Sequence, residues 1–169
     1  MNLDRFVIVI EGCDKCGKTS LATQLSAMLN WPVVKSSQPG PMGAVHEYIA
    51  ALHTNTGPFI ADRFHLGESV YGPLYRGGFG VNQYDFREIE RLLSARGALL
   101  VLMEDDPAWI VTRFRQLNED FARADDIPKL LDGFDREFHR SRLPKLRFRW
   151  HPHIPFLVSD VVHYMGRRP

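Results

Sequence analysis

Residues 12–19 read Gly12-Cys13-Asp14-Lys15-Cys16-Gly17-Lys18-Thr19 and fit the pattern G-x-x-x-x-G-K-[ST]. The apolar, β-branched run Phe6-Val7-Ile8-Val9-Ile10 precedes them, and residues 18–30 follow with apolar side chains at helical spacing. A strand, a glycine-rich turn and a helix in this order form a phosphate-binding loop, whose backbone N–H groups and helix N-terminus face phosphate oxygens. The stretch therefore predicts binding of a nucleoside triphosphate.

Each position of this loop has an expected role toward ATP and Mg²⁺. Lys18 is expected to reach the β- and γ-phosphates, and the Thr19 hydroxyl to bind magnesium. Gly12 and Gly17 let the backbone turn tightly enough for its N–H groups to point inward. The loop residues expected to bind the nucleotide are Gly12, Cys13, Asp14, Lys15, Cys16, Gly17, Lys18, Thr19 and Ser20.

Length and composition favour one domain over residues 1–169, because a chain of this size can bury a sizeable core. Its 21 Lys+Arg and 20 Asp+Glu give a net charge of +1, which is not typical of a general nucleic-acid binder. Six cations crowd residues 136–149, a stretch in which Glu137 is the single opposing charge, so we expect a basic surface there. With no signal-like N-terminus and no apolar run of membrane-spanning length, we expect a cytoplasmic protein without membrane contact, monomeric or homodimeric.

The two cysteines of the chain form a C-x-x-C pair inside the loop. This spacing elsewhere indicates thiol redox chemistry or half of a zinc site. Thiol exchange would distort a backbone that holds phosphate, and there is no second cysteine pair. We therefore interpret Cys13 and Cys16 as reduced loop residues.

Strand and helix signals alternate along the chain and predict an α/β fold of the P-loop NTPase type. We expect a three-layer sandwich of about five parallel strands with helices on both faces. The expected strands are residues 5–10, 32–35, 58–62, 98–103 and 155–159. The expected helices are residues 18–30, 44–52, 65–76, 83–96, 107–116 and 127–142.

Asp62 ends the apolar strand Phe59-Ile60-Ala61, and Arg63 follows it. The carboxyl ends of parallel strands are where ligands bind in open α/β sheets, so both side chains are expected near the phosphate loop. Asp62 is then a candidate magnesium ligand or general base. The alternative is an ordinary surface ion pair.

Together, residues 11–19, the stretch Asp62-Arg63-Phe64 and the stretch Val70-Tyr71-Gly72 resemble the thymidylate kinase family and its deoxynucleoside kinase relatives. The resemblance implies transfer of the γ-phosphoryl group of ATP to a nucleotide-type acceptor, with magnesium. It implies that Asp14 approaches the acceptor sugar, that Lys15 helps neutralise the transferring group, and that Glu11 is the base. It also implies a lid within residues 113–126, where Arg113, Arg115 and Arg123 could cover the phosphates.

Two departures from the family bear on the acceptor. The segment Lys35-Ser36-Ser37-Gln38-Pro39 replaces a Phe-x-Arg-Glu-Pro segment whose arginine grips the acceptor monophosphate, and the following insert is short. With the basic stretch, this favours an acceptor hydroxyl, as in the phage kinases that phosphorylate hydroxymethyluracil within DNA. The aromatic residues expected to stack a displaced base are Phe64, Tyr71, Tyr75 and Phe79.

The preferred hypothesis is thus a kinase acting on a thymine-like nucleotide, leaning to hydroxymethyluracil in DNA. The alternatives are a compact thymidylate or deoxynucleoside kinase acting on free substrates and, more remotely, a regulatory ATPase. The candidate catalytic residues are Lys18, Asp62, Glu11, Lys15 and Arg63, with Arg113 and Arg115 as further ATP-binding candidates and Thr19 and Asp62 as metal ligands. The candidate acceptor-binding residues are Asp14, Arg63, Phe64, Tyr71 and Arg76.

Overall fold

The computed structural model describes residues 3–36, 43–78, 81–117, 122–149 and 154–166. Two short 3₁₀ helices span Leu3–Arg5 and Ala124–Asp126. The strands are β1 (Val7–Glu11), β2 (Val33–Lys35), β3 (Phe59–Asp62), β4 (Leu99–Glu104) and β5 (Lys145–Arg149). The helices are α1 (Lys18–Leu29), α2 (Ala44–Thr54), α3 (His65–Tyr75), α4 (Gln83–Ala95), α5 (Pro107–Leu117), α6 (Ile127–Arg140) and α7 (Ile154–Gly166).

Within the described residues, the strands form one parallel sheet in the order β2-β3-β1-β4-β5. The central strand β1 is buried along its whole length, as its continuous apolar sequence predicts. Ile10 of β1 pairs in register with Asp62 of β3. The end of β3 therefore lies directly beside the start of the loop that follows β1.

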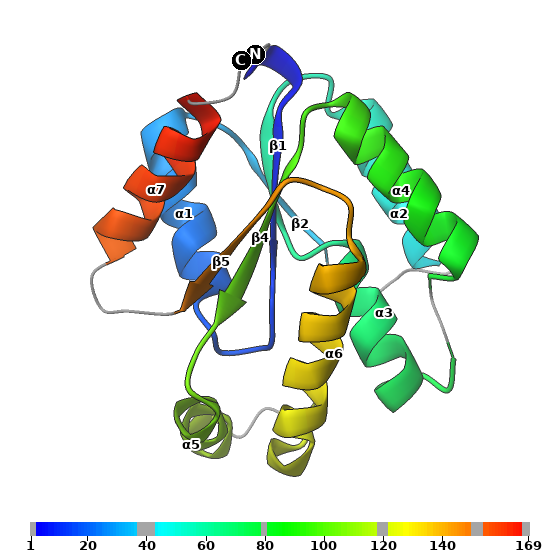
Figure 1. The fold of residues 1–169 in the computed structure, drawn as a ribbon, viewed down its shortest axis with the longest axis vertical. Coiled ribbons are helices and arrows are strands. Elements are labelled where there is room, and N and C mark those ends of the chain that lie inside the picture. The colour runs from blue at the N-terminus through cyan, green and yellow to red at the C-terminus, as the bar shows by residue number, and fades with distance from the viewer. Residues whose placement is uncertain (1–2, 37–42, 79–80, 118–121, 150–153, 167–169) are drawn as a thin grey trace.

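Helices cover both faces of this sheet and confirm the three-layer α/β expectation. Figure 1 shows α1 and α7 together on one side, with α2, α3, α4 and α6 on the other. The stripe that includes Ile127, Leu130 and Phe134 is buried, so the apolar face of α6 packs inward as its spacing predicts. Over the described ranges, no helix has both the length and the apolarity that crossing a membrane requires.

The last strand was predicted at the wrong place. Residues 155–159 lie in α7, and the fifth strand is formed by Lys145–Arg149 instead. The error has a physical reason. β5 is an edge strand in which charged and apolar residues alternate, whereas a continuous apolar run is typical of a strand buried on both faces. A short apolar run such as 155–159 fits a helix equally well.

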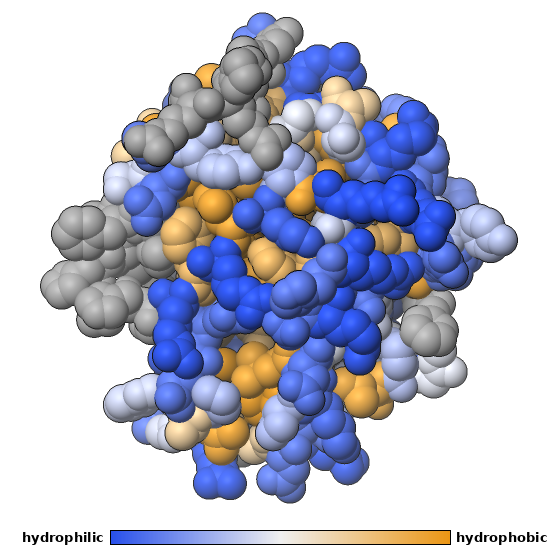
Figure 2. All heavy atoms as spheres, viewed as in Figure 1, coloured by the Kyte–Doolittle hydropathy of each residue, from blue (hydrophilic) through white to orange (hydrophobic). Residues whose placement is uncertain are grey.

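The basic stretch is also not the uncompensated surface that the sequence indicated. Arg147 forms ion pairs with Glu104 and Asp135, and both Arg136 and Arg140 pair with Glu137. The amine of Lys145 donates to three carbonyl oxygens at the end of α6. Figure 2 shows the face that carries β5 and α6, where hydrophilic residues are interleaved with apolar ones. The fold brings carboxylates from distant positions to these cations.

Arg96 links three segments at the opposite end of the sheet from the loop. Its guanidinium donates to the carbonyl oxygens of Arg5 at 2.9 Å, Leu52 at 2.8 Å, Asn55 at 2.6 Å and Gly57 at 2.5 Å. The residue is 7% exposed. One side chain thus satisfies carbonyls at the end of α2 and before β1 and β3.

Candidate active site

The loop after β1 adopts the tight turn that its glycines predict. Gly12 has φ +138°, and a Cβ on it would lie 2.2 Å from the carbonyl oxygen of Met103 in β4. Gly17 has φ +89° and immediately precedes α1. Lys15 has φ +67° although it is not glycine, a conformation that costs about 1–2 kcal/mol. The loop therefore has no room for a side chain at position 12, and it needs support at position 15.

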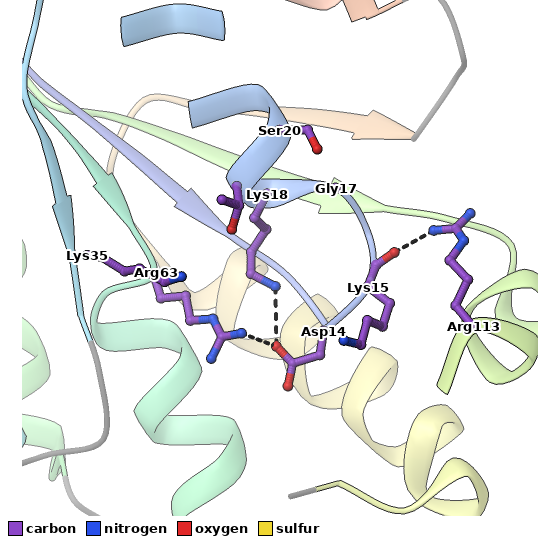
Figure 3. Close-up of a pocket in the computed structure, with 9 residues that line it drawn as sticks. Asp14, Lys15, Gly17, Lys18, Ser20, Lys35, Arg63 and Arg113 are labelled. Atoms are coloured by element: carbon purple, nitrogen blue, oxygen red, sulfur yellow. Dashed lines mark hydrogen bonds and ion pairs between the residues drawn. The ribbon is translucent and has the colours of Figure 1, made fainter. Parts of the chain in front are cut away.

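Lys18 begins α1 and points back into the curve of the loop, as Figure 3 shows. Its Nζ donates to the carbonyl oxygen of Cys13 at 2.7 Å and lies 3.6 Å from Oδ1 of Asp14. Only 5% of Lys18 is exposed. The loop thus holds a buried ammonium group whose partners within the loop are a carbonyl and one carboxylate.

Thr19 and Asp62, the two candidate magnesium ligands, are brought together. The Thr19 hydroxyl donates to Oδ2 of Asp62 at 2.7 Å. Asp62 is fully buried, and among the described residues its Oδ1 has no hydrogen-bond partner. A buried carboxylate oxygen without a partner is costly, and Mg²⁺ prefers carboxylate and hydroxyl oxygens. This pair of side chains therefore fits a magnesium ion.

A cavity of about 650 Å³ opens over the loop (Figure 3). Its lining contains five cationic side chains and one carboxylate, an excess of positive charge that suits a polyanion such as a triphosphate. The residues that line it are Asp14, Lys15, Gly17, Lys18, Thr19, Ser20, Lys35, Arg63 and Arg113.

Asp14 lies between two of these cations. The guanidinium of Arg63 donates to the same Oδ1 that faces Lys18. The backbone N–H of Asp14 donates to the hydroxyl of Tyr71 at 3.2 Å. Asp14 and Arg63 therefore both line the cavity. The carboxylate of Asp14 connects the loop to Arg63, the residue that follows β3.

Glu11 has a different environment from that expected of a base. It is fully buried, and its Oε1 accepts hydrogen bonds from the N–H groups of Phe64 at 3.0 Å, Leu66 at 2.8 Å and Gly67 at 3.4 Å. Burial raises the pKa of Glu11, although His65, the backbone N–H groups of Leu66 and Gly67, and Lys18 oppose the rise. Its carboxylate caps the N-terminus of α3 and does not line the cavity.

Three of the residues expected to bind the acceptor lie outside the cavity lining. Phe64 is 2% exposed and packs against Tyr48, with ring centroids 4.5 Å apart. Tyr71 is 6% exposed, and Arg76 forms an ion pair with Glu68. Stacking of a displaced base on Phe64 or Tyr71 does not fit this burial.

The two remaining aromatic candidates are Tyr75 and Phe79. Tyr75 is half-buried, and its hydroxyl donates to Oδ2 of Asp126 at 3.2 Å. Phe79 lies outside the described residues.

Of the three arginines in the expected lid segment, Arg113 lines the cavity. Its guanidinium donates to the carbonyl oxygen of Lys15 and to the carboxylate of Asp105. Arg115 and Arg123 are exposed and are not among the lining residues. Residues 118–121 of that segment lie outside the described residues.

Both thiols of the loop are free and buried. The Cys16 thiol donates to the carbonyl oxygen of Cys13 at 2.7 Å. Burial, with Cys16 nearby, raises the pKa of Cys13 to about 12, and burial also raises the pKa of Cys16. At neutral pH these are unreactive thiols that help to shape the loop.

Sequence reasoning missed two residues of the site. Lys35 is the last residue of β2 and lines the cavity, although its segment was interpreted as lacking a phosphate clamp. Asp105 follows β4 and holds Arg113. The signal that identified Asp62, a polar residue at the carboxyl end of a parallel strand, would have identified both.

No family model matches the sequence. Over 130 residues, the chain is 28% identical to the SPbeta prophage-derived uncharacterized protein YorR of Bacillus subtilis, covering 75% of this chain and 78% of YorR. The crystal structure of YorR in complex with phosphorylated GDP superposes with a TM-score of 0.79 at 22% identity, covering 95% of each chain.

Two kinases of assigned activity have similar structures. Deoxyadenosine kinase from M. mycoides, with the products dCMP and dCDP bound, gives a TM-score of 0.64 at 12% identity, covering 96% of this chain and all of that one. Thymidylate kinase from Ehrlichia chaffeensis gives 0.53 at 14% identity, covering 96% and 99%. This chain has a P-loop kinase fold. It agrees with the fold class that the loop and the alternating strands and helices predict. Identities of 12% and 14% do not identify a substrate.

Proposed function

We propose that this protein transfers the γ-phosphoryl group of ATP to the phosphate of a free nucleotide. The observation that carries the proposal is the arrangement of cations around Lys18. Figure 3 shows Lys35 and Arg63 on one side of Lys18, and Lys15 and Arg113 on the other. Two groups of cations suit two anionic substrates that meet at the loop.

The donor side is formed by the phosphate loop. Lys18, held by Cys13 and Asp14 in this structure, would turn to the phosphates of ATP, a stronger anionic partner than one carbonyl. Thr19 and Asp62 would hold magnesium, which when bound neutralises charge on the phosphate oxygens. Both ATP and magnesium therefore have matching groups in this chain.

The acceptor side is formed by Lys35 and Arg63. Lys35 has no ion-pair partner among the residues that the structure describes, so its charge is available to a ligand. A phosphate between Lys35 and Arg63 would present an anionic oxygen next to Lys18. Such an oxygen is already deprotonated at neutral pH, so transfer to it needs positioning and charge stabilisation rather than a general base.

The nucleotide ligands of related structures support this choice. YorR was crystallised with phosphorylated GDP, and the M. mycoides deoxyadenosine kinase with dCMP and dCDP. Two of the observations that favoured a DNA hydroxyl as acceptor carry less weight in the structure. Lys35 supplies a cation where a clamp was thought absent, and ion pairs compensate much of the basic stretch.

The test is transfer of label from γ-³²P-ATP with magnesium to three sets of acceptors. These are deoxy- and ribonucleoside monophosphates, the corresponding nucleosides, and DNA that contains hydroxymethyluracil. We expect a labelled nucleoside diphosphate, with no labelled product from the Lys18→Ala variant. Labelled DNA or nucleoside alone would overturn the acceptor, and release of phosphate that no acceptor suppresses would support a regulatory ATPase instead.

A further inference from the structure

Arg113 connects a buried carboxylate to the main chain of the phosphate loop. Asp105, which directly follows β4, is 8% exposed. Its Oδ2 accepts from the Arg113 guanidinium, while its Oδ1 accepts the N–H of Asp106 at 2.8 Å. Arg113 also donates to the carbonyl oxygen of Lys15. A single guanidinium thus bridges the end of β4 and the tip of the loop.

The position of this bridge matches the strained point of the loop. Lys15 is the non-glycine residue of the loop with positive φ, at +67°. A left-handed residue other than glycine persists where its surroundings hold it. Arg113 engages the carbonyl of that residue, and the next residues, Cys16, Gly17 and Lys18, carry the N–H groups that lead into α1.

We propose that Asp105 is a positioning residue for triphosphate binding, which holds Arg113 against the carbonyl of Lys15 and thereby keeps the loop in its phosphate-binding conformation. Asp105 does not line the cavity and acts through Arg113. The inference rests on the proposed function in one respect: the ligand of the loop is taken to be a nucleoside triphosphate.

The fold offers a matched control in the next residue. Asp106 is also an acidic residue between β4 and α5, but its Oδ1 accepts the N–H of Ala108 rather than a bond from Arg113. Asparagine keeps an acceptor oxygen at either position. Asp105→Asn retains the bond to the Asp106 N–H but places an amide group, which cannot accept, before Arg113.

The first measurement is calorimetric binding of Mg-ATP without acceptor, for the wild type, Asp105→Asn, Arg113→Gln, the double variant and Asp106→Asn. We expect Asp105→Asn to weaken binding about tenfold and Asp106→Asn to stay within about twofold of the wild type. The double variant should bind about as weakly as Arg113→Gln alone, because both changes break one connection. In transfer assays, the loss should lie in KM for ATP rather than in kcat.

A second measurement does not depend on any ligand. Amide hydrogen exchange of Cys16 and Gly17 in the ligand-free protein should be about tenfold faster in Asp105→Asn than in Asp106→Asn, with unchanged far-ultraviolet circular dichroism. Equal binding and equal exchange in the two variants, or additive losses in the double variant, would overturn the inference. A wild type that binds Mg-ATP without transferring phosphate would overturn the proposed function alone.

Discussion

Replacement of Glu11 by glutamine separates two roles for this residue, the general base implied by family resemblance and the helix cap seen in the structure. Glutamine keeps an acceptor oxygen for the N–H groups of Phe64, Leu66 and Gly67. It cannot accept a proton from a substrate. A cap role predicts a kcat within about fivefold of the wild type, whereas loss of a general base costs about 10²–10⁴-fold.

The effect on stability follows from the same bonds. Glu11→Gln removes a buried charge but places an amide N–H₂ at the position of Oε2, which has no hydrogen-bond partner among the described residues. The two effects partly offset each other, so the free energy of unfolding should fall by about 1–2 kcal/mol. Glu11→Ala leaves the two short bonds, to Phe64 and Leu66, without an acceptor. At about 1–3 kcal/mol for each buried unsatisfied donor, this costs about 2–6 kcal/mol. At about 2–4 °C per kcal/mol, the alanine variant should melt well below the glutamine variant.

The pH dependence gives a further check. The folded protein raises the pKa of Glu11 from 4.5 by burial. The folded state therefore retains a proton that the unfolded state has released, and stability falls as the pH rises from about 4.5 through the folded pKa. Glu11→Gln lacks this loss, so its stability relative to the wild type should rise across the same window. Thermal unfolding by circular dichroism between pH 4 and 8 measures it.

The decisive assay is steady-state phosphoryl transfer for the wild type and the two variants, alongside these melting curves. A glutamine variant that is fully folded at the assay temperature but has a kcat more than about a hundredfold lower would refute the cap interpretation. It would make Glu11 a group that acts on the reacting proton despite its burial.

Three further predictions test other parts of the structure. Gly12→Ala should abolish ATP binding in calorimetry, because its Cβ would meet the Met103 carbonyl at 2.2 Å, whereas Gly57→Ala, with open space around it, should bind normally. Lys35→Ala should raise KM for a nucleotide acceptor about tenfold, or about 1.4 kcal/mol, and leave KM for ATP unchanged; an equal rise in both would remove Lys35 from the acceptor side. Arg96→Met should lower the free energy of unfolding by about 3 kcal/mol or more without changing kcat, because buried carbonyl oxygens lose their donor; a wild-type melting temperature would show that these bonds contribute little.

Much of the fold could be predicted because four strands follow simple rules. The central strands β1, β3 and β4 are continuous apolar runs, and β2 precedes a loop rich in turn residues. The edge strand β5 was missed because its exposed face calls for alternating polarity. From sequence alone, such an alternating pattern is hard to distinguish from a charged surface segment. Its pairing with β4 in the structure identifies it as a strand.

The site was predictable where residue spacing along the chain fixes the geometry. Lys18 and Thr19 lie where the loop runs into α1, as expected. Asp62 meets Thr19 because β3, which ends at Asp62, is the neighbour of β1, the strand that leads into the loop. Side-chain direction was not predictable in the same way. Glu11 adjoins the loop in sequence, yet its side chain turns to α3, and Lys35 belongs to the site only because β2 ends beside β3.

The order of the strands suggests another role for the cations of β5, because this strand lies at the edge of the sheet. Lys145, Arg147 and Arg149 lie along a strand that pairs with β4 alone among the described strands, so it forms an open border of the sheet. The edge of a sheet can pair with a strand from another molecule, and charged side chains along an edge strand disfavour such pairing even where some of them, like Arg147, have carboxylate partners. We therefore expect the residues that first indicated contact with nucleic acid to hinder edge-to-edge pairing of this sheet with a second copy.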